Sequence, residues 1–307
     1  MNSSYEQKHP LYAASFTKRR KAMDLYEGGE RIEGNRAYLT RHTYESDKQY
    51  DIRASRATYR NFAAPIVDVF ASFINEGRPE RILPDALRPI EADADRYGIT
   101  ADAFFADVTR LAAAGGARFV IVDMEQKKGE TVAEDRASGR RMVPYFTSIS
   151  PDDVWDWGMD AKGLAWAVVH SEEMEHPAAF AAPLRYETLT VWTRDSWTRY
   201  RRPMKDKENT EYALSENGER RHGLGAVPLV PFLFEPTSHM TGLPATDDVL
   251  SLILRIYRRD SELDKMLFDR AVPLLNVGGV SQEHWDTFVV ASSNALMSTE
   301  PGGITAQ

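Results

Sequence analysis

The longest periodic stretch of the chain runs from Asp247 to Leu275 and reads DDVLSLILRIYRRDSELDKMLFDRAVPLL. At about 100° per residue its apolar side chains fall on one narrow face, which predicts a single amphipathic helix. Thr246 or Asp247 can cap its start, and Pro273 prevents it from continuing. Because a helix rises about 1.5 Å per residue, roughly 25 residues form a rod of about 37 Å. The fold must therefore accommodate one long, straight helix.

An acidic residue interrupts the apolar face of this predicted helix. That face consists of Val249, Ile253, Ile256, Leu263, Leu267 and Ala271, with Asp260 among them. The opposite side carries charged residues, namely Arg255, Arg258, Glu262, Lys265 and Asp269. Two interpretations remain open. The helix is either a core helix whose acid pairs with a neighbour, or a helix packed against copies of itself in a ring. In the second case Asp260 meets an arginine of the next subunit.

Composition defines the class of protein. With 42% hydrophobic and 27% charged residues among 307, the chain has the composition of an ordered globular protein. Its net charge of -8 disfavours a nucleic-acid binder held by a basic surface, but not a protein that lets DNA pass. The absence of cysteine excludes disulfides, thiolate metal sites and cysteine nucleophiles. We expect no signal peptide in the polar start MNSSYEQKHPLY and no membrane span, since no run of about 18 apolar residues occurs.

The remaining pattern predicts helices first and strands later. Helices are expected at residues 10–26 before a glycine pair, at 47–74 with an interruption at Pro65, and at 101–114 between Thr100 and a second glycine pair. Strands are expected at residues 117–124, 164–174 and 226–236, with a hairpin over 185–202. A short helix is expected near residue 151, a polar loop at 209–225, and a short strand after Pro273. This order predicts an α+β fold.

Acidic clusters offer candidate metal sites, but each departs from the spacing that a metal requires. His170 and His176 lie six residues apart and do not share a helical face. The acids of SPDDVWDWGMD lack the alternating ligands and distal glutamate of a calcium loop. Asp123 ends an apolar strand, yet no phosphate-binding loop accompanies it. We therefore expect no catalytic residue, no cofactor and no metal.

Basic residues form a possible contact for phosphate. Arg53, Arg56 and Arg60 lie three and four residues apart, which places them on one face of the helix predicted at residues 47–74. A solvated or salt-bridged face is the alternative interpretation. The loop GERRHG, residues 218–223, permits the same two interpretations.

Several segments, taken in order, resemble the portal proteins of tailed bacteriophages, especially a subfamily long catalogued as phage-related proteins of unknown function. The resemblance covers most of the chain and runs through HPLY, YDIRASRATYRNF, DADRYGITADAFFADVTRLAAAGGARFVIVDM, YFTSISPDDVWDW, GAVPLVPFLFEP and the long helical stretch. No single piece is specific, and the resemblance rests on their order.

The resemblance implies a ring, usually of twelve subunits, at one vertex of the capsid, through which double-stranded DNA is packaged and ejected. Implied partners are the major capsid protein, the terminase large subunit and a head-tail adaptor, with DNA passing non-specifically and no membrane. The implied locations are the virion and, during assembly, the host cytoplasm. The long helix would supply interface or channel residues, namely Arg255, Arg258, Arg259, Asp260, Glu262 and Lys265.

The same resemblance implies a division of the chain. Residues 1–236 would form a wing-like α/β region, residues 237–272 the stem helix, and residues 273–307 the start of a clip. A second stem helix and a crown are not expected within these residues. Two other functions remain open: a soluble enzyme acting through carboxylates such as Asp152, Asp153 and Glu172, or a monomeric adaptor or scaffold.

Overall fold

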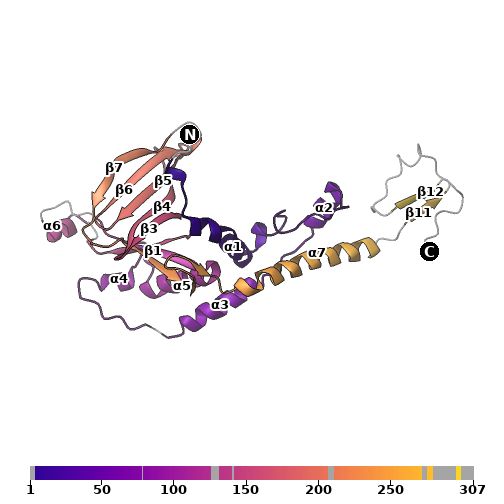
Figure 1. Ribbon diagram of the computed structural model, residues 1–307, viewed down its shortest axis with the longest axis horizontal. Helices are drawn as coiled ribbons and strands as arrows, with labels where there is room; N and C mark the ends of the chain where they lie inside the picture. The colour runs from indigo at the N-terminus through magenta and orange to yellow at the C-terminus, as the bar shows by residue number, and fades with distance from the viewer. Residues whose placement is uncertain are drawn as a thin grey trace. The chain divides into compact units, whose positions relative to one another are not determined.

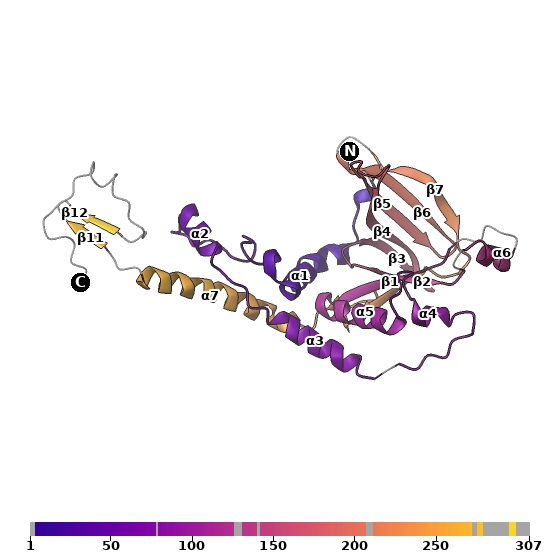
Figure 2. The ribbon, with the colours of Figure 1, turned by 180° about the vertical axis from the view of Figure 1, so that it is seen from behind.

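The computed structural model describes residues 4–77, 79–125, 131–139, 142–206, 211–271, 275–278 and 295–298 (Figures 1 and 2). It combines helices with antiparallel sheets, so the predicted α+β class is confirmed. The chain divides into two compact units. The first comprises Met1–Tyr26 and Ala63–Asp247, and the second comprises Glu27–Phe62 and Asp248–Gln307. This division differs from the predicted boundaries because residues 27–62 group with the long helix instead of with the mixed region.

A five-stranded antiparallel sheet dominates the first unit, as Figure 1 shows. Its strands follow one another in chain order, and the predicted hairpin is confirmed, with Arg194 and Asp195 between β5 and β6. Val154, Leu189 and Trp192 belong to its buried core. The strands are β3 (Val154–Asp160), β4 (Gly163–Glu175), β5 (Leu184–Thr193), β6 (Ser196–Pro203) and β7 (Ala213–Arg221).

Two of these strands correct the sequence prediction. A short helix was expected near residue 151, but residues 151–153 form a turn that leads into β3. Burial of Val154, Trp155 and Trp157 in the core favours the extended chain over the local helix signal. The expected polar loop at 209–225 contains β7. A side chain at Gly218 would lie 2.6 Å from the carbonyl oxygen of Arg199, so this glycine allows two strands to approach closely.

A second sheet of the first unit has the order β2-β1-β8, with β8 at its edge, as the three prolines of residues 226–236 predict. Helix α5 packs against it, with Thr100 capping the start and Gly116 ending it at φ 84°, both as predicted. A side chain at Gly116 would lie 2.4 Å from the carbonyl oxygen of Gly242. The bounds are α5 (Ala101–Gly115), β1 (Ala117–Asp123), β2 (Tyr145–Ile149), β8 (Leu229–Leu233), β9 (Glu235–Pro236) and β10 (Gly242–Leu243).

The other helices are short except for α1, which confirms the first predicted helix. The stretch predicted at 47–74 forms two helices, and the break lies at residues 55–62, ahead of Pro65. Their bounds are α1 (Pro10–Glu27), α2 (Asp47–Ala54), α3 (Ala63–Ile74), α4 (Pro89–Ala92) and α6 (Val132–Ala137). Single 3-10 turns occur at Ser4–Glu6, Gly29–Arg31, Met204–Asp206 and Asp247–Val249.

The predicted long helix is confirmed as α7 (Leu250–Ala271), preceded by one 3-10 turn. After it, β11 (Leu275–Gly278) pairs in parallel with β12 (Ala295–Ser298). Pro273 and most of the predicted clip lie outside the described residues. Among the helices that the structure describes, none combines the length and the apolar character needed to cross a membrane.

Candidate functional site

Helix α7 has one face buried within the second unit. Residues 27–62 run along this helix, and α2 contacts it directly (Figure 2). The buried side chains of the helix recur at three- and four-residue steps, as one face of a helix requires. They are Leu250, Ile253, Leu254, Tyr257 and Ser261.

Tyr257 lies at the centre of this inner face and is only 1% exposed. Its ring meets the ring of Tyr59 edge-on, with centroids 5.8 Å apart, the arrangement that the quadrupoles of aromatic rings favour. The Tyr257 hydroxyl donates to the carbonyl oxygen of Ile32 at 3.4 Å. Burial raises the pKa of Tyr257, and it raises the pKa of Tyr59 to about 12. Both phenols therefore stay neutral at ordinary pH.

Arg53 joins α2 to α7 through a buried hydrogen-bond network. Its Nε and Nη2 donate to the carboxylate of Glu45, each at 2.8 Å, and Nη2 also donates to the Thr40 carbonyl at 2.9 Å. Nη1 of Arg53 donates to Oγ of Ser261 at 3.1 Å, and that hydroxyl donates to the Arg258 carbonyl at 2.8 Å. Hydrogen bonds from Arg53 lower the pKa of Glu45 to about 2. The pair is ionised, bidentate and enclosed, so it fixes one arrangement of the two segments.

The three arginines proposed for phosphate contact do not share a helix face. Arg53 is 3% exposed and committed to Glu45. Arg56 and Arg60 follow the end of α2, because the helix stops at Ala54. The guanidinium of Arg56 lies over the ring of Phe268, 3.5 Å from its centroid. Arg60 is exposed. The structure thus contradicts the single stripe, since Arg53 does not face solvent.

The outer face of α7 is also apolar, but it is exposed. Leu263 is 53% and Leu267 58% exposed, and Leu252 and Met266 are similar. Ile256 lies half-buried at the edge of the same surface. Hereafter the outer stripe means Leu252, Ile256, Leu263, Met266 and Leu267.

The predicted apolar face of the helix falls between these two observed faces. Ile253 points inward and is buried, whereas Leu263 and Leu267 lie in the outer stripe. The side chain of Ala271 lies outside those that the structure describes. A single stripe was predicted because the helical spacing of the apolar residues combined members of two neighbouring apolar faces. The signal that could have separated them is the second apolar row formed by Leu250, Leu254 and Tyr257.

The predicted interface residues are distributed around the helix. Asp260 lies at the border of the outer stripe, 3.6 Å from Arg60 of the same chain. Arg258 turns inward and donates to the Tyr38 carbonyl at 2.8 Å, and Glu262 lies 3.6 Å from His42. Lys265 is half-buried. Arg255 is exposed at the edge of the outer stripe and Arg259 is exposed within it, and neither makes an ion pair with another residue that the structure describes.

A second exposed apolar surface was missed at the sequence level. Helix α3 buries Ala63, Val67 and Ala71, which recur at four-residue steps, in the first unit. The larger side chains of the same helix remain exposed. This α3 surface consists of Val69, Phe70, Phe73 and Ile74.

Each carboxylate considered for an enzyme lies near a basic group of the first unit. Asp152 accepts hydrogen bonds from Arg19, the closer at 2.8 Å, and Glu172 pairs with Arg185 at 2.8 Å. Asp153 lies 3.3 Å from His170. In the part of the chain that the structure describes, no three metal-ligating side chains converge on a common point.

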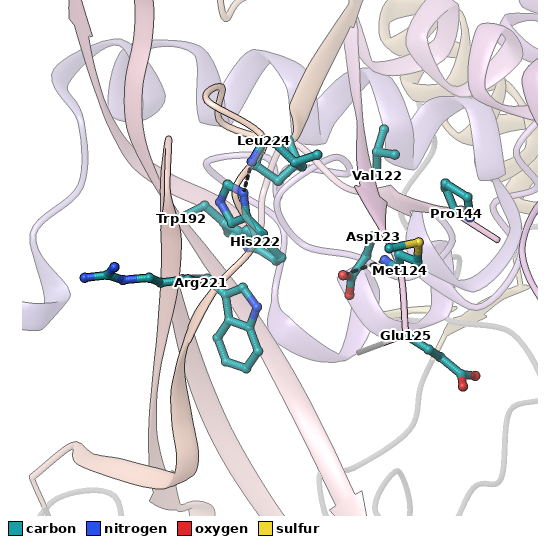
Figure 3. A pocket seen from close by; sticks show the side chains of 11 residues that line it. Val122, Asp123, Met124, Glu125, Pro144, Trp192, Arg221, His222 and Leu224 are labelled. Atoms are coloured by element: carbon teal, nitrogen blue, oxygen red, sulfur yellow. Dashed lines mark hydrogen bonds between the residues drawn. The ribbon is translucent and has the colours of Figure 1, made fainter. Parts of the chain in front are cut away.

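One pocket of the first unit combines aromatic and charged side chains (Figure 3). It has a volume of about 420 Å³ and lies between the end of β1 and the β5–β6 hairpin with the end of β7. Its lining residues are Val122, Asp123, Met124, Glu125, Pro144, Trp192, Trp197, Arg221, His222, Leu224 and Pro228. The sequence indicated Asp123 only as the end of a strand.

Comparisons with known proteins do not identify a family. No family model matches the chain, and no curated protein sequence matches it. Among solved structures, it is similar to a chain of "Neck of native GTA particle computed with C12 symmetry", with 12% identity and a TM-score of 0.31. The similarity covers 81% of this chain and 55% of that chain, so this chain spans just over half the length of its match.

Proposed function

We propose that this chain is a structural, non-catalytic subunit of a tailed-phage portal, and that it assembles with copies of itself into a ring at the capsid vertex. Double-stranded DNA passes through the ring during packaging and ejection. The capsid protein, the terminase and a head-tail adaptor are the partners in this role. The observation that carries the proposal is the outer stripe of α7, which stays exposed although the opposite face of the helix is already packed.

The outer stripe is suited to a protein partner. Full burial of a leucine or methionine contributes about 2 kcal/mol, so burying the exposed halves of four such residues contributes about 4 kcal/mol per interface. Contiguous apolar surface of this kind commonly marks an interaction site. Arg255 lies at one edge of the stripe and Arg259 lies within it, between Leu252 and Met266 on the helix surface. The stripe therefore offers a partner charged contacts as well as apolar ones.

A closed ring needs two different surfaces on each subunit, since its contacts run head to tail. The α3 surface provides the second. Its apolar side chains are flanked by Asp68 and Glu76, both exposed, so its charge complements Arg255 and Arg259. We therefore propose that the outer stripe of one subunit docks on the α3 surface of the next.

The charge distribution favours passage of DNA over retention. Each phosphate that a protein neutralises adds affinity and would slow translocation. The chain carries a net charge of -8, and Arg53 is committed to Glu45 within the second unit. Only Arg56 and Arg60 of the predicted stripe remain for contact with a phosphate.

The proposal is tested by measuring particle mass and by imaging the purified protein. We expect rings near twelve subunits. Leu263→Gln combined with Leu267→Gln should abolish assembly, and so should Phe73→Gln. An equal mixture of these two variants should form dimers, because one intact copy of each surface remains. Ile82→Gln replaces an exposed apolar residue outside both surfaces and should leave assembly unchanged. A wild-type protein that stays monomeric at high concentration would contradict the proposal.

A further inference from the structure

The aromatic wall of the pocket in Figure 3 has the geometry of a cation-binding surface. The Trp192 ring neighbours the rings of Trp197 and His222, with centroids 6.0 and 6.1 Å away. The electron-rich face of an indole attracts cations within about 6 Å of its centroid. The chain itself already uses this property, since the guanidiniums of Arg199 and Arg220 lie 5.2 and 5.6 Å from the Trp197 ring.

The charge of the pocket comes from Asp123. Its carboxylate points toward the side on which Trp192 and His222 lie (Figure 3). It accepts hydrogen bonds from the Tyr145 hydroxyl at 2.9 Å and from the Met124 amide at 2.8 Å. These donors are neutral, and Asp123 forms no ion pair with any basic residue that the structure describes.

The other charged groups at the pocket are paired or point away from its aromatic wall, and Arg96 lies over the ring of Tyr145, which donates to Asp123. Glu125 pairs with Arg96, and the guanidinium of Arg221 points away from the aromatic wall in Figure 3. Nε2 of His222 lies 3.1 Å from the Thr193 carbonyl, while its Nδ1 accepts from the Leu224 amide at 3.3 Å. This pattern places the single proton of a neutral imidazole on Nε2. The wall opposite Asp123 therefore presents aromatic rings, of which Trp197 already carries the guanidiniums of Arg199 and Arg220.

The apolar residues of the lining indicate which kind of ligand the pocket can hold. Val122, Pro144, Leu224 and Pro228 enclose a volume of about 420 Å³, which is larger than a bare ion requires. A cation on a hydrocarbon stem fits both features, because its stem contacts the apolar wall while its head reaches the carboxylate.

We propose that this pocket binds a guanidinium or ammonium group carried on an alkyl chain. The head lies against the aromatic wall and donates hydrogen bonds to Asp123. Two sources share this chemistry: an arginine or lysine side chain of a partner protein, and a free alkylguanidine or alkylamine. The proposal does not depend on ring assembly.

The test uses indole NMR signals of Trp192 and Trp197 in the full chain during titration with small probes. N-acetyl-arginine amide should shift both signals and bind about tenfold more tightly than N-acetyl-citrulline amide, its uncharged isostere. Butylguanidinium separates the two sources. If it binds as well as the amide, the head and stem suffice and a free ligand is favoured; if the amide binds better, a protein side chain is favoured.

Variants assign the effect to Asp123. Asp123→Asn should weaken binding of N-acetyl-arginine amide about tenfold, since a charge-assisted hydrogen bond is lost. Asp195→Asn removes an exposed acid outside the pocket lining and should leave binding unchanged. Equal binding of the arginine and citrulline amides, preferential binding of acetate, or an Asp123→Asn variant with unchanged affinity would each overturn the proposal.

Discussion

The two faces of α7 carry similar apolar side chains but differ in whether other segments of the chain cover those side chains. The inner face encloses Tyr257 and is fixed by the hydrogen bonds of Arg53 to Glu45 and Ser261. The outer stripe is exposed and carries two arginines, Arg255 at its edge and Arg259 within it. The difference teaches that one helix can serve two purposes. The inner face determines the fold of the second unit, and we propose that the outer stripe serves assembly.

The largest effect is expected from Arg53→Ala. Removing one partner of a buried ion pair leaves the other charge uncompensated, which costs about 3–5 kcal/mol. Denaturant unfolding should show this loss for the second unit. Arg56→Ala is the matched control, since it removes only a contact over Phe268 worth less than about 1 kcal/mol. Equal losses in the free energy of unfolding of the two variants would show that the buried ion pair does not stabilise the inner face more than an exposed contact does.

The second largest loss in the free energy of unfolding is expected at acid pH, where the ion pair of the inner face is weakened. The pKa of Glu45 is lowered to about 2 in the folded chain, whereas an unperturbed glutamate titrates near 4.3. The stabilisation is therefore complete above about pH 4.5 and is lost as the pH falls toward about 2, amounting to about 3 kcal/mol. Unfolding measured across this range should show the loss. Glu45→Gln should remove most of this pH dependence, and a variant that retained it would exclude Glu45 as its source.

Asp260 lies at the border between the two faces and should affect the fold only slightly. Its contact with Arg60 is long and partly exposed, and such pairs contribute about 0.5 kcal/mol. Asp260→Leu should therefore change assembly more than thermal stability. Arg60→Ala breaks the same contact and should have a similarly small effect on stability. A collapse of stability in Asp260→Leu with unchanged assembly of the folded fraction would assign Asp260 to the inner face.

The smallest effect on folding is expected in the outer stripe. Leu263→Gln combined with Leu267→Gln should change the free energy of unfolding of the dissociated chain by less than about 0.5 kcal/mol. The outer halves of both side chains are exposed within the chain, and glutamine keeps the Cβ and Cγ atoms nearest the helix, so little burial is lost. Unfolding at low protein concentration measures this directly. A large loss would mean that the outer stripe packs within its own chain.

Local signals predicted much of the fold. Thr100 and Gly116 bound α5 where the capping rules place its ends, and the β5–β6 hairpin has its turn at the expected position. Local sequence signals gave the wrong structure at β3 and β7, where pairing with neighbouring strands overrides a local preference for a helix or a loop. Sequence spacing also grouped Arg53 with Arg56 and Arg60. It could not reveal that α2 ends at Ala54 or that Arg53 forms a buried ion pair with Glu45.

The candidate surfaces were harder to predict than the elements that carry them. Periodicity identifies apolar residues but not which of two faces a neighbouring segment covers. The apolar spacing of residues 47–74 predicted a helix, and it did not show that Val69, Phe70, Phe73 and Ile74 stay exposed. The pocket joins Asp123, Trp192 and His222 from distant parts of the chain, and no local pattern links such residues.

The most direct test of the central claim is a labelling experiment, which the absence of native cysteine permits. Leu263→Cys places a single thiol in the outer stripe, and Ser251→Cys places one at an exposed position of the same helix outside it. The reaction rate with a maleimide is measured in assembled particles and in dissociated chains. We predict that assembly slows labelling at position 263 at least tenfold and leaves position 251 unchanged. Equal rates at position 263 in both states, in particles whose mass confirms assembly, would contradict the account.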